Sequence, residues 1–125
     1  MAREQGNLTA LIVDDDKATV DSLKWLLEYE GLVVDYEPST EKGLRRLGDK
    51  NYDLVITDLN QIPSGVDVYR AATKKGMKAR IITGGASDPL MEEAKKVAGT
   101  DLIIKPNIFE PILYFVDRLK AEKQK

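Results

Sequence analysis

Three consecutive aspartates, Asp14, Asp15 and Asp16, follow directly after the apolar run LIV at residues 11–13. Such a run is typical of a buried strand, and burying an unpaired carboxylate is costly or forces it to take up a proton. Adjacent carboxylates also repel one another, so this pattern predicts a cation among them. Histidine and cysteine are absent. The remaining oxygen ligands favour a hard cation, Mg²⁺ with Mn²⁺ as the alternative.

Three further polar residues end later apolar segments. Asp58 closes the apolar run of YDLVITDLN, Thr83 closes IIT, and Lys105 closes IIK. A carboxylate beside a bound cation can act as the nucleophile toward a phosphoryl group and form an aspartyl phosphate. The cation, the Lys105 ammonium and the Thr83 hydroxyl would hold the phosphoryl oxygens as charge develops. Backbone N–H groups of the turn Gly84-Gly85 offer further donors.

Each of these residues has a plainer interpretation when taken alone. Asp16 is as well suited to cap the following helix as to bind a metal. Thr83 is an ordinary strand residue by type, and a lone lysine such as Lys105 is usually a solvated charge. The plainer interpretations explain the joint arrangement of all the strand ends poorly, because four of the five predicted strands end in such groups.

Five short apolar segments predict strands, at residues 8–13, 32–36, 53–57, 79–83 and 101–105. Consecutive Leu, Ile and Val suit strands that are covered on both faces. Apolar residues between and after them recur with helical spacing: Val20, Leu23, Leu26 and Leu27; Leu90, Met91, Ala94 and Val97; Phe109, Ile112, Leu113, Val116 and Leu119.

Boundary residues agree with this alternation. Gly31 is placed to end the first helix, a weaker helix is predicted at about 39–48, and Asp88 followed by Pro89 predicts an N-cap with proline in the first turn. Five strand–helix units predict an α/β fold: a five-stranded parallel sheet, doubly wound, with helices on both faces. The carboxyl ends of parallel strands line one crevice, where the polar residues would meet.

Composition narrows the class of protein. The chain has 125 residues, a length that predicts one domain. Its net charge of −2 gives no overall electrostatic field that would attract nucleic acid or an anionic membrane. It lacks a membrane-length apolar stretch and the apolar core of a signal peptide, so we expect neither membrane insertion nor direct nucleic-acid binding. The expected location is the cytoplasm.

The chain resembles a response-regulator receiver domain over roughly residues 8–120. The motifs that carry the resemblance are VDDD, YDLVITDLN, IITGG and IIKP, in this order and spacing. The resemblance implies the flavodoxin-like (βα)5 fold and Mg²⁺-dependent phosphorylation of Asp58 in a two-component or phosphorelay system. It also implies a cis Lys105–Pro106 bond. The implied metal ligands are Asp14 (through water), Asp15, Asp58 and the Asn60 backbone carbonyl, and the implied phosphoryl contacts are Thr83 and Lys105.

The implied partners are a sensor histidine kinase or a histidine phosphotransfer protein, together with a downstream protein target. Such a domain catalyses its own phosphorylation and dephosphorylation, without independent substrate turnover. We expect residues 1–125 to form a single receiver domain without an effector domain, either stand-alone or taken from a longer protein.

Three departures from the family pattern bear on signalling. Leu102 stands three positions before Lys105, where most receivers have an aromatic residue that follows the hydroxyl during switching. Pro63 lies one residue later after Asp58 than usual, and the segment between Gly99 and Lys105 is one residue shorter. We therefore expect intact phosphate chemistry and an atypical output.

Four other interpretations can be set against the sequence. A dehalogenase-type phosphatase needs an acid–base aspartate two positions after the nucleophile, where this chain has Asn60. A dinucleotide site needs glycines after the first strand, and a flavodoxin needs a Ser/Thr/Gly phosphate loop there; DDDKAT has neither. The remaining alternative is a receiver-like interaction module that is not phosphorylated in its working cycle.

Overall fold

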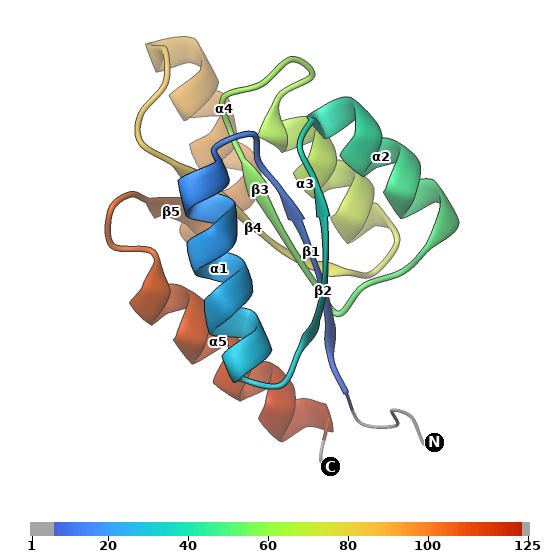
Figure 1. Ribbon diagram of the computed structural model, residues 1–125. Helices are drawn as coiled ribbons and strands as arrows, with labels where there is room; N and C mark the ends of the chain where they lie inside the picture. Colours follow the sequence, from blue (N-terminus) through green and yellow to red (C-terminus); the bar gives the residue numbers. More distant parts are fainter. Residues whose placement is uncertain (1–6, 124–125) are drawn as a thin grey trace.

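The computed structural model describes residues 7–123. Strands and helices alternate along the chain (Figure 1), in the order β1 (Thr9–Val13), α1 (Lys17–Tyr29), β2 (Val33–Glu37), α2 (Thr40–Asp49), β3 (Leu54–Asp58), α3 (Gly65–Lys74), β4 (Lys78–Thr83), α4 (Asp88–Ala98), a 3₁₀ turn η1 (Gly99–Asp101), β5 (Leu102–Ile104) and α5 (Phe109–Lys123). The strands form one parallel sheet in the order β2-β1-β3-β4-β5. The predicted fold class is therefore confirmed.

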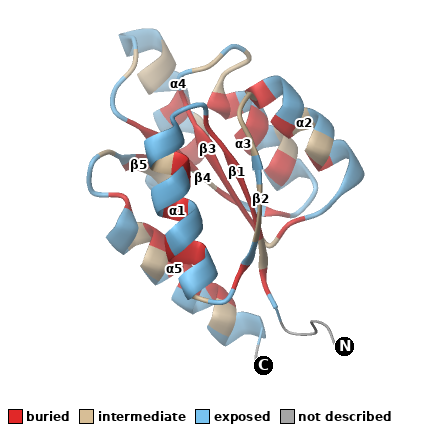
Figure 2. Ribbon diagram, viewed as in Figure 1, coloured by how far each residue is buried: buried red, intermediate tan, exposed pale blue. Residues whose placement is uncertain are grey.

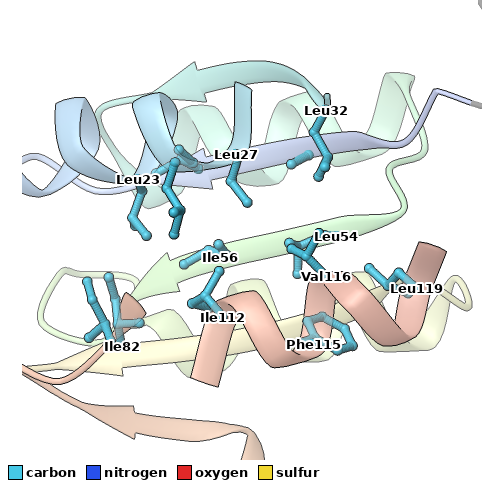
Figure 3. Close-up of a cluster of buried hydrophobic side chains, with 14 of the residues drawn as sticks. Leu23, Leu27, Leu32, Leu54, Ile56, Ile82, Ile112, Phe115, Val116 and Leu119 are labelled. Atoms are coloured by element: carbon cyan, nitrogen blue, oxygen red, sulfur yellow. The ribbon is translucent and has the colours of Figure 1, made fainter. Parts of the chain in front are cut away.

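The helices cover the sheet in two layers. α1 and α5 lie side by side on one face, and α2, α3 and α4 lie on the other (Figure 1). Figure 3 shows side chains of α1 and α5 directed toward those of the strands, among them Leu27, Ile112 and Ile56. On the opposite face, Leu47, Val68 and Ala94 of the three helices join a second buried cluster with strand residues. Burial of this apolar surface is the main force that holds the strand ends in register.

The strands differ in how far they are covered (Figure 2). Every residue of β3 is buried, whereas Val33 and Tyr36 of β2 are exposed. The prediction that all strands are covered on both faces is wrong for the two edge strands, because Ile104 of β5 is exposed as well. β2 and β5 each pair with a single neighbouring strand, so they bury less surface than the central strands.

Helix boundaries follow the predicted signals with one shift. Gly31 has φ +93° directly after the C-cap of α1, as predicted, and this is a conformation that glycine adopts without strain. The N-cap of α4 is Ser87, whose hydroxyl accepts from the Leu90 N–H, so the prediction of Asp88 as the cap is wrong by one residue. Asp88 lies in the first turn instead, where its negative charge interacts favourably with the positive end of the helix dipole.

The fifth helix has a narrower apolar stripe than predicted. Ile112, Val116 and Leu119 are buried as expected, but the Phe109 side chain is exposed because it lies at the first position of α5, beyond the edge of the core. Among residues 7–123, no helix combines the length and the apolar character needed to cross a membrane.

Candidate functional site

The sheet brings the predicted strand ends together at its upper edge in Figure 1. β1 and β4 both pair with β3, and Asp58 at the end of β3 lies opposite Ile82 of β4. Thr83, one residue further along β4, lies opposite Ile104 of β5, and Lys105 follows directly. Strands from four parts of the sequence therefore end next to one another, as the parallel topology requires.

Three carboxylates meet at this edge, and together with Thr83 and Lys105 they make up the group of residues that we call the strand-end pocket. Asp14, Asp15 and Asp58 each offer one oxygen, and these oxygens all lie within 4.8 Å of one another. The Asp14 and Asp58 side chains are buried, with 1% and 7% of their residue surface exposed, whereas Asp15 is exposed. The predicted cluster is thus present, with one member facing solvent and two enclosed.

Asp14 is held in an unfavourable electrostatic environment. Burial raises its pKa to about 6, and the nearby charge of Asp58 acts in the same direction, while a hydrogen bond from the Asp16 N–H to Asp14 Oδ1 (2.9 Å) opposes the rise. The other oxygen, Oδ2, is buried without a hydrogen-bond partner in residues 7–123. A buried oxygen of this kind is costly unless something binds it.

Asp58 shares this environment. Burial raises the pKa of its carboxyl group, and the positive charge of Lys105 is the largest opposing influence. The backbone N–H of Asn60 donates to Asp58 Oδ2 at 3.2 Å. The start of α3 packs so closely that a Cβ at Gly65 would clash with the Asp58 carbonyl, so only glycine fits there.

The Thr83 hydroxyl is held by its own loop. It accepts a hydrogen bond from the Gly85 N–H (2.9 Å), and the Asn60 side-chain amide lies 3.5 Å from it. The Gly85 N–H therefore points at Thr83, not into the pocket as a further donor. The family resemblance implies a role for Asn60 only through its backbone carbonyl, as a metal ligand. Its side chain also donates to the Gly85 carbonyl at 2.7 Å, a contact between two loops that no local sequence signal indicates.

Lys105 reaches across to the start of α1. Its ammonium donates to the Thr19 hydroxyl (3.4 Å), which in turn donates to Asp16 Oδ2 (2.6 Å). Asp16 occupies the predicted N-cap position of α1, but its side chain accepts from the Thr19 hydroxyl and makes no capping hydrogen bond to the helix backbone. The Lys105–Pro106 bond is cis, as predicted. Thr19 was missed from the sequence, since it lies within a helix with no motif around it.

The donor set fits a hard divalent cation. Carboxylate oxygens are the ligands that Mg²⁺ and Mn²⁺ prefer, and the buried, unpartnered Asp14 Oδ2 belongs to one of the clustered carboxylates. A cation placed there would relieve both the desolvation of Asp14 and its repulsion by Asp58.

Leu102 is the first residue of β5, at the end of the strand away from Thr83 and Lys105. Its partly buried side chain packs against the cluster under α3 and α4. The neighbouring Asp101 accepts from the Tyr69 hydroxyl (2.6 Å) and pairs with Arg80 (3.0 Å). The Arg80 guanidinium stacks 3.5 Å above the Phe115 ring centroid. Asp101 and Arg80 therefore each have defined partners on this surface.

Known proteins resemble this chain over most of its length. It is 33% identical over 101 residues to the transcriptional regulatory protein FixJ of Rhizobium meliloti, covering 78% of this chain and 50% of that protein. It is 27% identical over 109 residues to the transcriptional regulatory protein CutR of Streptomyces coelicolor, covering 85% and 50%. The chain thus spans about half the length of the curated relatives it matches.

Solved structures agree. A receiver domain protein (CheY-like) from Methanospirillum hungatei JF-1 superposes with a TM-score of 0.79 at 28% identity, covering 94% of this chain and 97% of that one. The family model for the response regulator receiver domain matches residues 10–116. This range includes all the strand-end residues described above. The chain therefore belongs to the response regulator receiver domain family of two-component signalling.

Proposed function

We propose that this chain is a phosphoacceptor receiver domain, and that Asp58 takes a phosphoryl group from a sensor histidine kinase or a histidine phosphotransfer protein in a reaction that needs Mg²⁺. The observation that carries the proposal is the meeting of Asp14, Asp15 and Asp58, with a buried Asp14 oxygen that lacks a partner in the described chain. Residues 1–125 act as a single receiver unit in the cytoplasm, and phosphorylation changes the binding of a protein target.

The residues divide the work by position. Asp14, Asp15, Asp58 and the Asn60 backbone carbonyl would hold the cation, with Asp14 acting through a water. When bound, the cation supplies positive charge to the phosphoryl oxygens. A carboxylate oxygen of Asp58 attacks phosphorus, the bond between phosphorus and the donor breaks, and its electron pair leaves with the donor.

Thr83 and Lys105 would bind the phosphoryl oxygens of the phosphorylated Asp58. Since the Thr83 hydroxyl accepts from Gly85 in the present structure, its own hydrogen can be given to a phosphoryl oxygen. Lys105 exchanges its contact with Thr19 for the new negative charge. The loop after β4 moves inward with Thr83, and this movement breaks the contact between Asn60 and Gly85.

Phosphorylation by a small donor tests the proposal. Acetyl phosphate with Mg²⁺ should add one phosphoryl group that hydroxylamine and base remove, as expected for an acyl phosphate. Asp58→Asn should abolish the labelling, because an amide is a poor nucleophile. Asp53→Asn, at the residue that directly precedes the same strand, is the matched control and should label normally.

Two outcomes would contradict the proposal. A phosphoryl group found by mass spectrometry on a serine or threonine would remove Asp58 from its role. Failure of the intact protein to label or to bind beryllofluoride with Mg²⁺ would favour the alternative, a receiver-like interaction module that is not phosphorylated.

A further inference from the structure

The loop between β3 and α3 is tied to a helix from another part of the chain. The Gln61 side-chain oxygen accepts from the backbone N–H of Thr40, the first residue of α2, at 2.9 Å, and its amide lies 3.4 Å from the Pro38 carbonyl. The Thr40 hydroxyl returns the contact by donating to the Pro63 carbonyl at 2.6 Å. We call these contacts between Gln61, Pro63 and the segment 38–40 the loop clamp.

The loop clamp supplies hydrogen-bond partners for backbone and side-chain groups of Thr40 that would otherwise lack them. The first N–H groups of a helix have no partner within that helix, and Gln61 supplies one for Thr40 while Ser39 caps Lys42. The Thr40 side chain is wholly buried, so its hydroxyl needs the Pro63 carbonyl. Ile62 between them is fully exposed, which shows that packing does not hold the middle of the loop.

The residue held by the loop clamp is Asn60. It directly precedes Gln61, and it is fixed on its other side by its own side chain, which donates to the Gly85 carbonyl. The loop is therefore held from α2 on one side and from the loop after β4 on the other. Without the loop clamp, we expect the segment 60–64 to gain alternative paths, so that the Asn60 backbone is held in one position in a smaller part of the population.

We infer that Gln61 and Thr40 are positioning residues for the strand-end pocket, because they hold the β3–α3 loop in the shape that presents the Asn60 carbonyl to a bound divalent cation. This inference rests on the proposed function. Pro63, which lies one residue later after Asp58 than usual, takes part in the loop clamp through its carbonyl.

The expected effect follows from population arithmetic. The apparent affinity for a ligand falls by the fraction of molecules whose site is competent to bind. Loss of one or two neutral hydrogen bonds corresponds to about a threefold to tenfold change in that fraction. The Mg²⁺ dissociation constant should therefore rise by about threefold to tenfold, although neither residue offers a side-chain ligand.

The test is an Mg²⁺ titration of the full chain followed by the amide NMR signals of Asn60 and Gly85. Gln61→Met keeps the length of the side chain and Thr40→Val keeps its volume, and both should weaken Mg²⁺ binding. Gln61→Glu keeps the acceptor for the Thr40 N–H, and Thr40→Ser keeps the hydroxyl. Both should stay within about twofold of the wild type.

A matched control separates positioning from general loss of stability. Thr73→Val makes the same substitution at a hydroxyl that bonds within α3 to the Tyr69 and Arg70 carbonyls, and it should leave Mg²⁺ affinity unchanged. Hydrogen exchange without metal should be faster at residues 59–64 in Gln61→Met than in the wild type, while the thermal midpoint stays close. If Thr40→Val fails to fold, the partly exposed Gln61 still provides the measurement.

Two results would overturn the inference, and only the second would also overturn the proposed metal site. Equal Mg²⁺ affinity in Gln61→Met and the wild type, with unchanged exchange at 59–64, would overturn the positioning role and leave the proposed function standing. A wild-type protein that binds no Mg²⁺ would overturn the proposed metal site and this inference together.

Discussion

The strand-end pocket and the surface around β5 differ in how well their polar groups are satisfied. In the pocket, Asp14 is buried with an oxygen that lacks a partner within residues 7–123, and burial raises the pKa of both Asp14 and Asp58. Around β5, Asp101 is bonded to Tyr69 and Arg80 at once. Asp14 stays in an unfavourable environment until a cation binds, whereas Asp101 already has a hydrogen-bond donor and an ion-pair partner.

This difference indicates which part of the molecule can respond to a ligand. A ligand shifts a conformational equilibrium only by its differential affinity for the two states. Cation binding in the pocket would relieve the desolvation of Asp14 and its repulsion by Asp58. Under the proposed function, we therefore expect the loop around Thr83 and Gly85 to respond to the ligand. Leu102 carries no ring and no polar group, and it can follow only through packing.

The largest effect is expected from removing one of the three clustered carboxylates. Asp15→Ala should reduce Mg²⁺-dependent labelling from acetyl phosphate by at least about a hundredfold, because charge stabilisation by a metal is worth several kcal/mol. The fold should persist, since Asp15 is exposed and its removal eases repulsion with Asp14 and Asp58.

The matched control removes a carboxylate from the next helix. Asp21→Ala deletes an exposed carboxylate that pairs with Lys17 on α1, and it should label at the normal rate. Normal labelling of Asp15→Ala would mean that the metal ligands have been assigned wrongly.

An intermediate effect concerns stability and pH. Burial raises the pKa of Asp14 from 3.8 to about 6, so the folded state holds a proton that the unfolded state releases. This group's stabilising contribution is complete below pH 3.8 and is lost as the pH rises to about 6. Asp14→Asn removes the titration. Without divalent ions, it should therefore be more stable than the wild type above this window by on the order of 1–3 kcal/mol.

Urea unfolding at several pH values measures this difference. The advantage of Asp14→Asn should grow between about pH 4 and pH 6 and then level off. Saturating Mg²⁺ should stabilise only the wild type. A difference that is independent of pH would mean that burial does not raise the pKa of Asp14 in the folded state.

The smallest expected effect concerns how far a change at the strand-end pocket reaches toward β5. Beryllofluoride with Mg²⁺ should change hydrogen exchange clearly at residues 83–89 and only weakly at residues 100–115, because Leu102 couples the two regions through packing alone. Leu102→Tyr is the comparison variant, and it should show the larger change at 100–115. Strong changes at 100–115 in the wild type, with 83–89 quiet, would show that the coupling does not depend on the Leu102 side chain.

Much of the fold and of the site follows from the sequence. Apolar runs that alternate with helical periodicity predict a parallel α/β sheet, and residues that directly follow such runs must lie at its carboxyl edge. This reasoning needs only local spacing. It places Asp14, Asp58 and Thr83 at one edge of the sheet, and the structure confirms that they lie close together.

The tertiary structure alone decided which side chains bridge distant segments. The exposure of β2, the contact of Asn60 with Gly85, that of Lys105 with Thr19 and that of Gln61 with Thr40 depend on the strand order β2-β1-β3-β4-β5. These contacts join residues far apart in the chain through a single hydrogen bond each. Periodicity records which face a residue occupies, but it does not record which neighbour the folded chain places opposite.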